Sequence, residues 1–400
     1  MAGHRRMATV LTTDGDQRAA LAIVRSLGMR GHRVYVCSTR QRSLAGASRY
    51  ARGEAAIPDP MRDPAGFRRG IEQLLRRWNA DVLIPVTDAA LLSVSSDPPR
   101  DGVVVPFPPS HIVRATADKA LVLATAATLG IPVPRQFVLA RPPAQVTAGD
   151  LRFPLVVKPT RSVTAVDHGY RQFRVAHAPD LASLERALER FAPQAYPVLV
   201  QERIAGAGMG VSFLIWDGKL VAAFAHRRLR EKPPAGGVSV YCESVALDPA
   251  VMEASRKLLH ALGWRGVAMV EYRCEARTGT PYLMEVNGRF WGSLQLALDA
   301  GVDFPGLLLD AAQGRRPSSV TEYTVGARSR WLWGDVDHLV LRLARSGGAL
   351  ALGADAPSRW TALRDFFRLT PRDRFEALQA RDWRPFWRET IDRLRPWGGG

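Results

Sequence analysis

The stretch Val267-Ala-Met-Val-Glu-Tyr-Arg-Cys274, followed after a short connection by Pro281-Tyr-Leu-Met-Glu-Val-Asn287, decides the fold of this chain. Both segments are rich in apolar and β-branched residues, which favour strands. The connection contains Arg277-Thr-Gly-Thr280, a short loop with the glycine that hairpins use. The two segments are therefore predicted to form an antiparallel β-hairpin.

Two glutamates are expected to meet across this hairpin. If the loop centres on Thr278, Glu271 and Glu285 are equally far from its centre and face each other. Asn287 lies two residues beyond Glu285, and side chains two apart on a strand point to the same face. Two carboxylates and one amide oxygen are therefore expected on one face of the sheet.

Opposed like charges destabilise a sheet, so a positive group is expected between the glutamates. Carboxylate and amide oxygens suit Mg²⁺ better than zinc, and Mg²⁺ commonly binds together with phosphates. The alternative is a solvated hairpin whose glutamates point into water. Arg289, two residues beyond Asn287 and beside the aromatic pair Phe290-Trp291, favours the binding site, because a surface hairpin has no evident need for it.

Composition places the chain among ordinary globular proteins. Its 400 residues allow two or three domains, and contents of 46% hydrophobic and 23% charged residues are unexceptional. No apolar run approaches the roughly 18 residues of a transmembrane segment, and no signal-peptide pattern is present, so a cytoplasmic location is expected. The three cysteines are widely spaced and suggest neither a disulfide framework nor a zinc site.

The net charge of +17 raises the question of nucleic-acid binding. Only five of the 55 basic residues are lysine, and the arginines are spread through every segment rather than gathered in a stripe. This distribution resembles a composition bias, so no nucleic-acid partner is expected. A basic surface could equally attract anionic nucleotides or metabolites.

The first hundred residues alternate strands and helices. Strands are expected near 8–13, 33–38 and 82–86, with helices near 17–29 and 65–79, a pattern typical of a helix-covered parallel sheet. The turn after the first strand lacks GxGxxG, and the second strand lacks the acid that would hold a ribose. We expect a supporting or substrate-side α/β domain rather than a dinucleotide-binding domain.

Two further features leave alternatives open. Lys158 ends the apolar strand Phe153-Pro-Leu-Val-Val-Lys158, where it either extends to the surface or meets a phosphate. Six of the ten tryptophans lie in the last eighty residues, namely Trp331, Trp333, Trp360, Trp383, Trp387 and Trp397. They indicate either an amphipathic membrane or partner surface, or a helical tail whose aromatic side chains dock on the body of the protein.

Several motifs in order carry a family resemblance: Asp118-Lys119, Val156-Val-Lys-Pro159, Val200-Gln-Glu-Arg-Ile204, Glu271, and Glu285-Val-Asn-Gly-Arg289. Together they resemble the ATP-grasp superfamily, and within it the carboxylate–amine ligase-like branch related in core architecture to D-alanine–D-alanine ligases, biotin carboxylases and carbamoyl-phosphate synthetases. The resemblance covers about 110–310.

The resemblance implies a mixed α/β and α+β fold. Its expected parts are an N-terminal parallel α/β (pre-ATP-grasp) domain over 1–109, a two-lobed ATP-grasp domain over 110–315 (small lobe about 137–200, large lobe about 201–315), and a Trp/Arg-rich, mainly helical C-terminal tail over 316–400. A homodimer is compatible with it, since many relatives are dimers.

The resemblance also implies roles for individual residues. Lys119 and Lys158 would bind ATP phosphates, and the backbone of Gln201, Glu202 and Ile204 would read the adenine edge, with Glu202 the best candidate for a side-chain contact. Glu271, Glu285 and Asn287 would hold one or two Mg²⁺ ions (or Mn²⁺), and Arg289 would steady the transferred phosphoryl group. The sequence departs from the family at 160–169, which has one glycine where many members have a glycine-rich phosphate loop; Ser162 or Thr164 are the expected donors there.

The implied reaction activates a small-molecule carboxylate with ATP as an acyl phosphate and joins it to an amine. Arg228 and Arg230 could clamp the substrate carboxylate and Gly236-Gly237 could hinge a flap, or these could be a solvated basic strand and an ordinary turn. Three alternatives remain: another phosphoryl transfer or a carboxylation at the same site, nucleotide binding without turnover, or an interaction protein. The sequence does not identify the acid or the amine.

Overall fold

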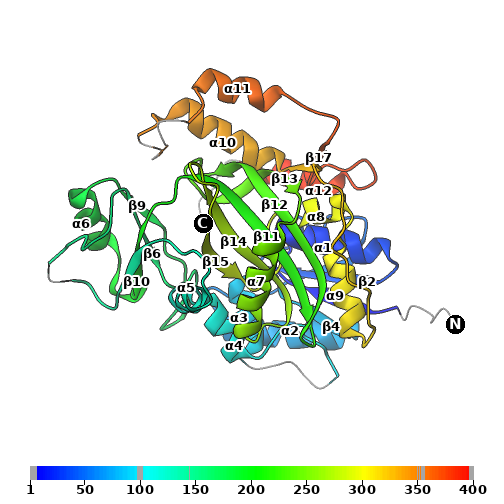
Figure 1. The fold of residues 1–400 in the computed structure, drawn as a ribbon. Coiled ribbons are helices and arrows are strands. Elements are labelled where there is room, and N and C mark those ends of the chain that lie inside the picture. The colour runs from blue at the N-terminus through cyan, green and yellow to red at the C-terminus, as the bar shows by residue number, and fades with distance from the viewer. Residues whose placement is uncertain are drawn as a thin grey trace.

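The computed structural model describes residues 7–96, 102–143, 145–348, 350, 352 and 356–395. Within these residues the chain forms sheets of four, four and seven strands and a separate two-stranded hairpin, with helices packed around them (Figure 1). One sheet is parallel and the other two are mainly antiparallel. The predicted mixture of α/β and α+β architecture is confirmed.

The N-terminal sheet has the order β3-β2-β1-β4, and its strands are parallel. The predicted alternation of strands and helices is confirmed, but β3 was not predicted, because its sequence Ala-Arg-Gly-Glu-Ala-Ala lacks apolar alternation and it pairs only with β2 at the sheet edge. The elements are β1 (Thr9–Thr12), α1 (Arg18–Met29), β2 (Arg33–Ser38), β3 (Ala51–Ala56), α2 (Pro64–Trp78), β4 (Val82–Ile84) and α3 (Asp88–Ser95).

Two helices lead to the second sheet, whose order is β5-β10-β6-β9. The segment that departs from the family's glycine-rich loop folds into the β7–β8 hairpin, and its Tyr170 N–H donates to Met61 O of the N-terminal domain at 2.7 Å. The elements here are α4 (Ser110–Ala117), α5 (Lys119–Thr128), β5 (Gln136–Leu139), β6 (Leu155–Pro159), β7 (Thr164–Val166), β8 (Gly169–Arg171), β9 (Ala176–Ala178), α6 (Leu181–Arg190), the short 3₁₀ helix Pro193–Ala195 and β10 (Val198–Glu202).

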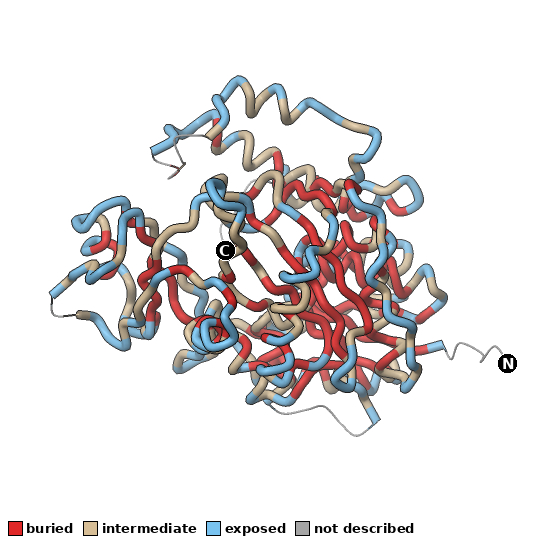
Figure 2. The backbone as a smooth tube through the Cα atoms, viewed as in Figure 1, coloured by how far each residue is buried: buried red, intermediate tan, exposed pale blue. Residues whose placement is uncertain are grey.

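The large sheet has the order β15-β14-β11-β12-β13-β16-β17 and forms the centre of the molecule (Figure 1). Figure 2 shows that its strands are mostly buried, whereas α6 and α11 are largely exposed. Its strands are β11 (Gly206–Trp216), β12 (Lys219–Lys232), β13 (Val238–Val245), β14 (Gly266–Glu275), β15 (Pro281–Asn287), β16 (Arg328–Arg330) and β17 (Asp373–Phe375). The helices after β13 are α7 (Pro249–Ala261), α8 (Leu294–Ala300), α9 (Phe304–Ala312), α10 (Leu332–Ala344), α11 (Arg359–Phe367) and α12 (Arg384–Leu394).

The C-terminal region is helical as expected, but it also contributes β16 and β17 to the large sheet. Two of its tryptophans dock: Trp331 Nε1 donates to Glu389 at 2.5 Å and Trp333 Nε1 to Thr390 at 2.9 Å. Trp360, Trp383 and Trp387 are exposed, and Trp397 lies outside the described residues. Docking on the body of the protein therefore explains Trp331 and Trp333 but not the exposed tryptophans of this region.

The predicted register of the β14–β15 hairpin is confirmed, because Glu271 pairs directly with Glu285. However, the strands reach this pairing in a different way from the one expected. Closer to the turn Tyr272 pairs with Leu283, so β15 contains a bulge of one extra residue between Leu283 and Glu285. The bulge compensates for a turn that is not centred on Thr278.

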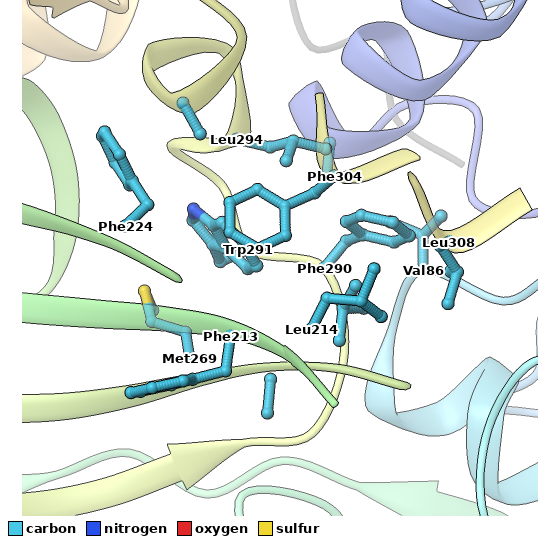
Figure 3. Close-up of a cluster of buried hydrophobic side chains, with 14 of the residues drawn as sticks. Val86, Phe213, Leu214, Phe224, Met269, Phe290, Trp291, Leu294, Phe304 and Leu308 are labelled. Carbon is cyan, nitrogen blue, oxygen red and sulfur yellow. The ribbon is translucent and has the colours of Figure 1, made fainter. Parts of the chain in front are cut away.

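An aromatic core fixes the chain immediately after β15. Phe290 and Trp291 are almost completely buried and pack among side chains of the large sheet, α8, α9 and the N-terminal domain (Figure 3). The Trp291 ring meets Phe304 edge to face, with centroids 5.1 Å apart. Gly288 is required for close approach, since a Cβ there would lie 2.3 Å from the Trp264 ring. This packing holds Asn287 and Arg289 on either side of Gly288 in place.

Arg25 joins the C-terminal segment to the N-terminal domain. Its guanidinium is 1% exposed and contacts the Asp382 carboxylate at 2.8 Å, and it also donates to the carbonyls of Glu376, Ala377 and Asp382. Asp382 accepts further hydrogen bonds from Ser48 Oγ and the Arg49 N–H. Because both charges are buried, removing either Arg25 or Asp382 would leave the other buried without its counter-charge.

Arg25→Met is expected to destabilise the protein by about 3–5 kcal/mol, because it leaves the Asp382 carboxylate buried without its counter-charge. Arg40→Met is the matched control: Arg40 also bridges the two regions, through Asp16 and Asp392, but its side chain is 51% exposed. It should cost about 1 kcal/mol or less. Thermal unfolding of both variants checks this, and equal shifts in melting temperature would contradict it.

Candidate functional site

Two carboxylates that face each other across the β14–β15 hairpin lie at the centre of the candidate site. Glu271 and Glu285 come from adjacent strands, and their side chains are 16% and 26% exposed. Burial raises the pKa of Glu271; Arg228 opposes this effect and the charge of Glu285 adds to it. Burial also raises the pKa of Glu285, but Lys119 and Lys158 outweigh it and hold that pKa well below its usual value.

Asn287 lies beside the two glutamates as predicted, but its side-chain amide is turned the other way. Its Nδ2 donates to Glu271 Oε1 at 2.8 Å and to Glu285 Oε1 at 3.3 Å, while its Oδ1 accepts from Arg289 Nη2 at 3.1 Å. The amide therefore presents its NH₂ group to the carboxylates where the sequence led us to expect its oxygen. Rotating the amide by half a turn would exchange the two atoms.

Two lysines approach Glu285 from different elements. Asp118 caps α5 by accepting from the Ala120 N–H at 3.1 Å, which fixes Lys119 in the first turn of the helix. Lys119 Nζ lies 3.1 Å from Glu285 Oε2 and donates to Ser162 Oγ at 2.7 Å. Ser162, which was expected to donate to a phosphate, accepts a hydrogen bond from Lys119 in this structure.

Lys158 is the second lysine and lies near the end of β6. Burial lowers the pKa of Lys158 to about 8, with the charge of Glu285 opposing the shift. Its ammonium forms no hydrogen bond or ion pair with any residue in the described part of the chain. Lys158 is 8% exposed, and a largely buried lysine whose ammonium has no ion-pair partner in the described residues suits an anionic ligand.

Arg228 meets the pair from the side of β12. Its Nη2 lies 2.5 Å from Glu271 Oε2, and its Nη1 donates to Glu231 Oε1 and to Gly237 O, each at 3.0 Å. Arg273 donates to the other oxygen of Glu231 at 3.0 Å. Glu231 thus holds two arginines beside the carboxylate pair.

Arg289 connects the site to the N-terminal domain. Its Nε lies 3.0 Å from Asp88 Oδ1, and Asp88 begins α3. Asp88, Lys119, Ser162, Glu285 and Asn287 also line one small cavity. The N-terminal domain therefore contributes directly to the wall of the site.

Arg230, which was expected to act with Arg228, is not brought to the carboxylate pair. Its Nε and Nη2 bind both oxygens of the buried Asp335 on α10, at 2.6 and 2.7 Å. An irregularity in the β12–β13 pairing between Arg228 and Arg230 separates the two side chains. Arg230 attaches α10 to β12 in this structure.

The segment expected to read the adenine lies at the junction of β10 and β11. Gln201 is buried and donates to Gln136 Oε1 at 2.6 Å, whereas the Glu202 carboxylate accepts from the Arg152 N–H at 2.9 Å. Glu202 therefore already has a partner, in the segment that precedes β6. Within the described residues, no main-chain carbonyl accepts the N–H of Ile204.

Sequence reasoning did not select Asp88, Glu231 or Arg273. A signal existed for two of them: Arg273 lies two residues from Glu271 on the same strand, and Asp88 follows the carboxyl end of a parallel strand, where sites commonly form. Glu231 lies in a basic run, and its contact with two arginines depends on the irregular β12–β13 pairing.

The two carboxylates suit Mg²⁺, and the Asn287 oxygen would join them once its amide group is rotated by half a turn. No group of three or more His, Cys, Asp or Glu side chains suited to a metal occurs in the described residues, so the third ligand would have to be Asn287 or come from a bound substrate. Lys119 and Arg228 supply the positive charge that the carboxylate pair requires in this structure.

No helix of the described chain is both long and apolar enough to cross a membrane.

Residues 194–334 match a family model described as ATP-grasp in the biosynthetic pathway with Ter operon. This segment contains β11 to β15 and therefore the carboxylate pair. No curated protein matches the chain.

Many solved structures have a similar fold, and three of them illustrate the range. The L-amino acid ligase of Bacillus licheniformis has 17% identity and a TM-score of 0.59, over 78% of this chain and 75% of that one. A biotin carboxylase–β-γ-ATP complex from Campylobacter jejuni has 16% identity and a TM-score of 0.62, over 81% and 74%. The biotin carboxylase domain dimer of Hydrogenobacter thermophilus 2-oxoglutarate carboxylase, in complex with MgADP, ADP and bicarbonate, has 14% identity and a TM-score of 0.60, over 81% and 74%.

The parallel N-terminal sheet and the two mainly antiparallel sheets agree with these matches. The chain therefore has the ATP-grasp fold, and its residues 194–334 match an ATP-grasp family model.

Proposed function

We propose that this protein is an ATP-dependent ligase that activates a carboxylate as an acyl phosphate and joins it to an amine. The observation that carries the proposal is a partly buried pair of carboxylates, Glu271 and Glu285, surrounded by four cations. These are Lys119, Lys158, Arg228 and Arg289. The four cations come from separate segments of the chain. Such an arrangement suits a polyanion that arrives with a divalent cation.

Lys158 supports nucleotide binding most specifically. It is buried without an ion-pair partner in the described residues, and a phosphate oxygen would supply one. Lys119 would share the phosphates, and the N–H of Ile204 would serve as a donor to the adenine edge. Glu271, Glu285 and the Asn287 oxygen would hold Mg²⁺, which would neutralise phosphate charge when bound.

The proposed chemistry requires positioning more than a protein nucleophile. A substrate carboxylate oxygen forms a bond to the γ-phosphorus while the bond to the β–γ bridging oxygen breaks, releasing ADP. The amine nitrogen then bonds to the acyl carbon, phosphate leaves, and the nitrogen loses a proton. Arg289, fixed by Asp88 and Asn287, would stabilise the transferred phosphoryl group, and Arg228, fixed by Glu231 and Glu271, would orient the substrate carboxylate.

The similarity to an L-amino acid ligase favours amide formation, whereas the similarity to biotin carboxylases keeps a carboxylation reaction as the second candidate. Both use the same proposed nucleotide site. Nucleotide binding without turnover is the third candidate, and the complete set of cations and carboxylates argues against it.

The direct test measures ADP released from Mg·ATP in the presence of pooled carboxylic acids, with and without pooled amines. ADP should form only when an acid and an amine are both present. Glu285→Ala should lower the rate by roughly 100-fold or more, because it removes half of the carboxylate pair. Glu322→Ala, an exposed glutamate far from the pair in sequence, is the control and should keep full activity.

ADP formation that needs bicarbonate but no amine would favour carboxylation instead. Equal ADP release by wild type and Glu285→Ala would exclude the proposed site altogether.

Arg228 and Arg230 provide a second test, because the structure gives these neighbouring residues different partners. Arg228→Lys keeps the charge beside Glu271 but loses the forked geometry, so ADP release should fall by about tenfold or more. Arg230→Lys loses the two-oxygen contact with Asp335 and should lower the melting temperature while leaving the rate near the wild-type value. The opposite pattern would show that Arg230, not Arg228, serves the reaction.

A further inference from the structure

A second cavity lies between the N-terminal domain, the large lobe and the C-terminal segment. Its volume is about 620 Å³, within the range of small-molecule sites. It is lined by residues of α1, of α8 and of the segment around β17, and none of the residues assigned to the nucleotide site lines it. Its apolar wall consists of Met29, Leu298, Phe375, Leu378 and Ala380.

Two acceptor atoms on the α8 side of this cavity have no partner in the described residues. They are Gln295 Oε1 and Asp299 Oδ2. Gln295 is 7% exposed, and the Asp299 side chain is 9% exposed. Their other polar atoms bind each other, with Gln295 Nε2 donating to Asp299 Oδ1 at 3.0 Å. Buried acceptors left without donors are costly, so a ligand that carries N–H donors would stabilise this side.

Arg374 of β17 supplies a positive charge close to these acceptors. Arg374 approaches Asp299 only to 3.9 Å, and its side chain is 64% exposed. This distance is too long for a hydrogen bond, and no other partner of its guanidinium occurs in the described residues. Burial raises the pKa of Asp299 to about 6, and Gln295, Arg374 and Arg25 oppose this shift.

A ligand that satisfies all three features has a cationic donor, an anionic group and an apolar body. A metal ion is a poor match, because the described residues contain no metal-binding group of three His, Cys, Asp or Glu side chains and an arginine lies beside Asp299. A simple amine would leave Arg374 without an anion, and a simple carboxylate would leave Gln295 and Asp299 without donors. An α-amino acid carries both charged groups on one carbon atom.

We propose that this cavity is a second small-molecule site, which binds an apolar α-amino acid with its ammonium group on Asp299 and Gln295 and its carboxylate on Arg374. The apolar side chain packs against Leu298 and Phe375. The proposal does not depend on the proposed ligase reaction, because the nucleotide-site residues take no part in it.

Calorimetric titration of the full chain with L-leucine tests the proposal. Leucine should bind, and isopentylamine and 4-methylpentanoate, which lack the carboxylate and the ammonium group respectively, should each bind about tenfold more weakly or not at all. Asp299→Asn keeps the size of the side chain and should weaken leucine binding by about tenfold or more. Arg374→Gln, at an exposed position where folding is not at risk, should also weaken it.

Two controls separate this site from the nucleotide site and from general surface effects. Arg372→Gln changes an exposed arginine of the same segment that does not line the cavity, and it should leave leucine affinity unchanged. Glu285→Ala should also retain it, whether or not the ligase reaction is correct. The proposal is overturned if leucine does not bind, if Arg374→Gln and Asp299→Asn bind it as wild type does, or if Glu285→Ala abolishes the binding.

Discussion

The opposition of Glu271 and Glu285 on adjacent strands is the constraint that organises this protein. Two carboxylates that face each other in a partly buried position destabilise a sheet unless cations surround them. The cations come from α5, β6, β12 and the segment after β15. Parts of the chain more than a hundred residues apart therefore have an electrostatic reason to meet at one place.

The surrounding fold keeps these charges apart from bulk water and in fixed positions. Asp88 extends the charge network into the N-terminal domain through Arg289, and the buried Phe290 and Trp291 hold that arginine's segment against the core. Arg25 and Asp382 fasten the C-terminal segment to the opposite side of the N-terminal domain. Packing and ion pairs together thus define the relative positions of the elements that build the site.

Local sequence patterns predicted much of this arrangement. Strand periodicity predicted that Glu271 faces Glu285, although the turn is not centred on Thr278 and a bulge in β15 restores this register. The alternation of strands and helices predicted the parallel N-terminal sheet. Local patterns could not predict the partners of Arg228 and Arg230, because an irregular strand pairing, which the sequence does not encode in a recognisable way, turns Arg230 toward Asp335. They also could not predict β3, β16 and β17, short strands that depend on neighbours distant in the chain.

The central claim is that the cations around the carboxylate pair bind the phosphates of a nucleotide, and a titration of Mg·ATP across pH tests it most directly. Because the pKa of Lys158 is lowered to about 8, its ammonium is charged below that pH and loses its charge above it. A bound phosphate favours the charged form, so affinity should fall as the pH rises through about 8. Lys158→Arg stays charged throughout and should remove this decline. The account predicts tight binding with that pH dependence in wild type alone; failure of the wild-type protein to bind Mg·ATP, or the same decline in Lys158→Arg, would contradict it.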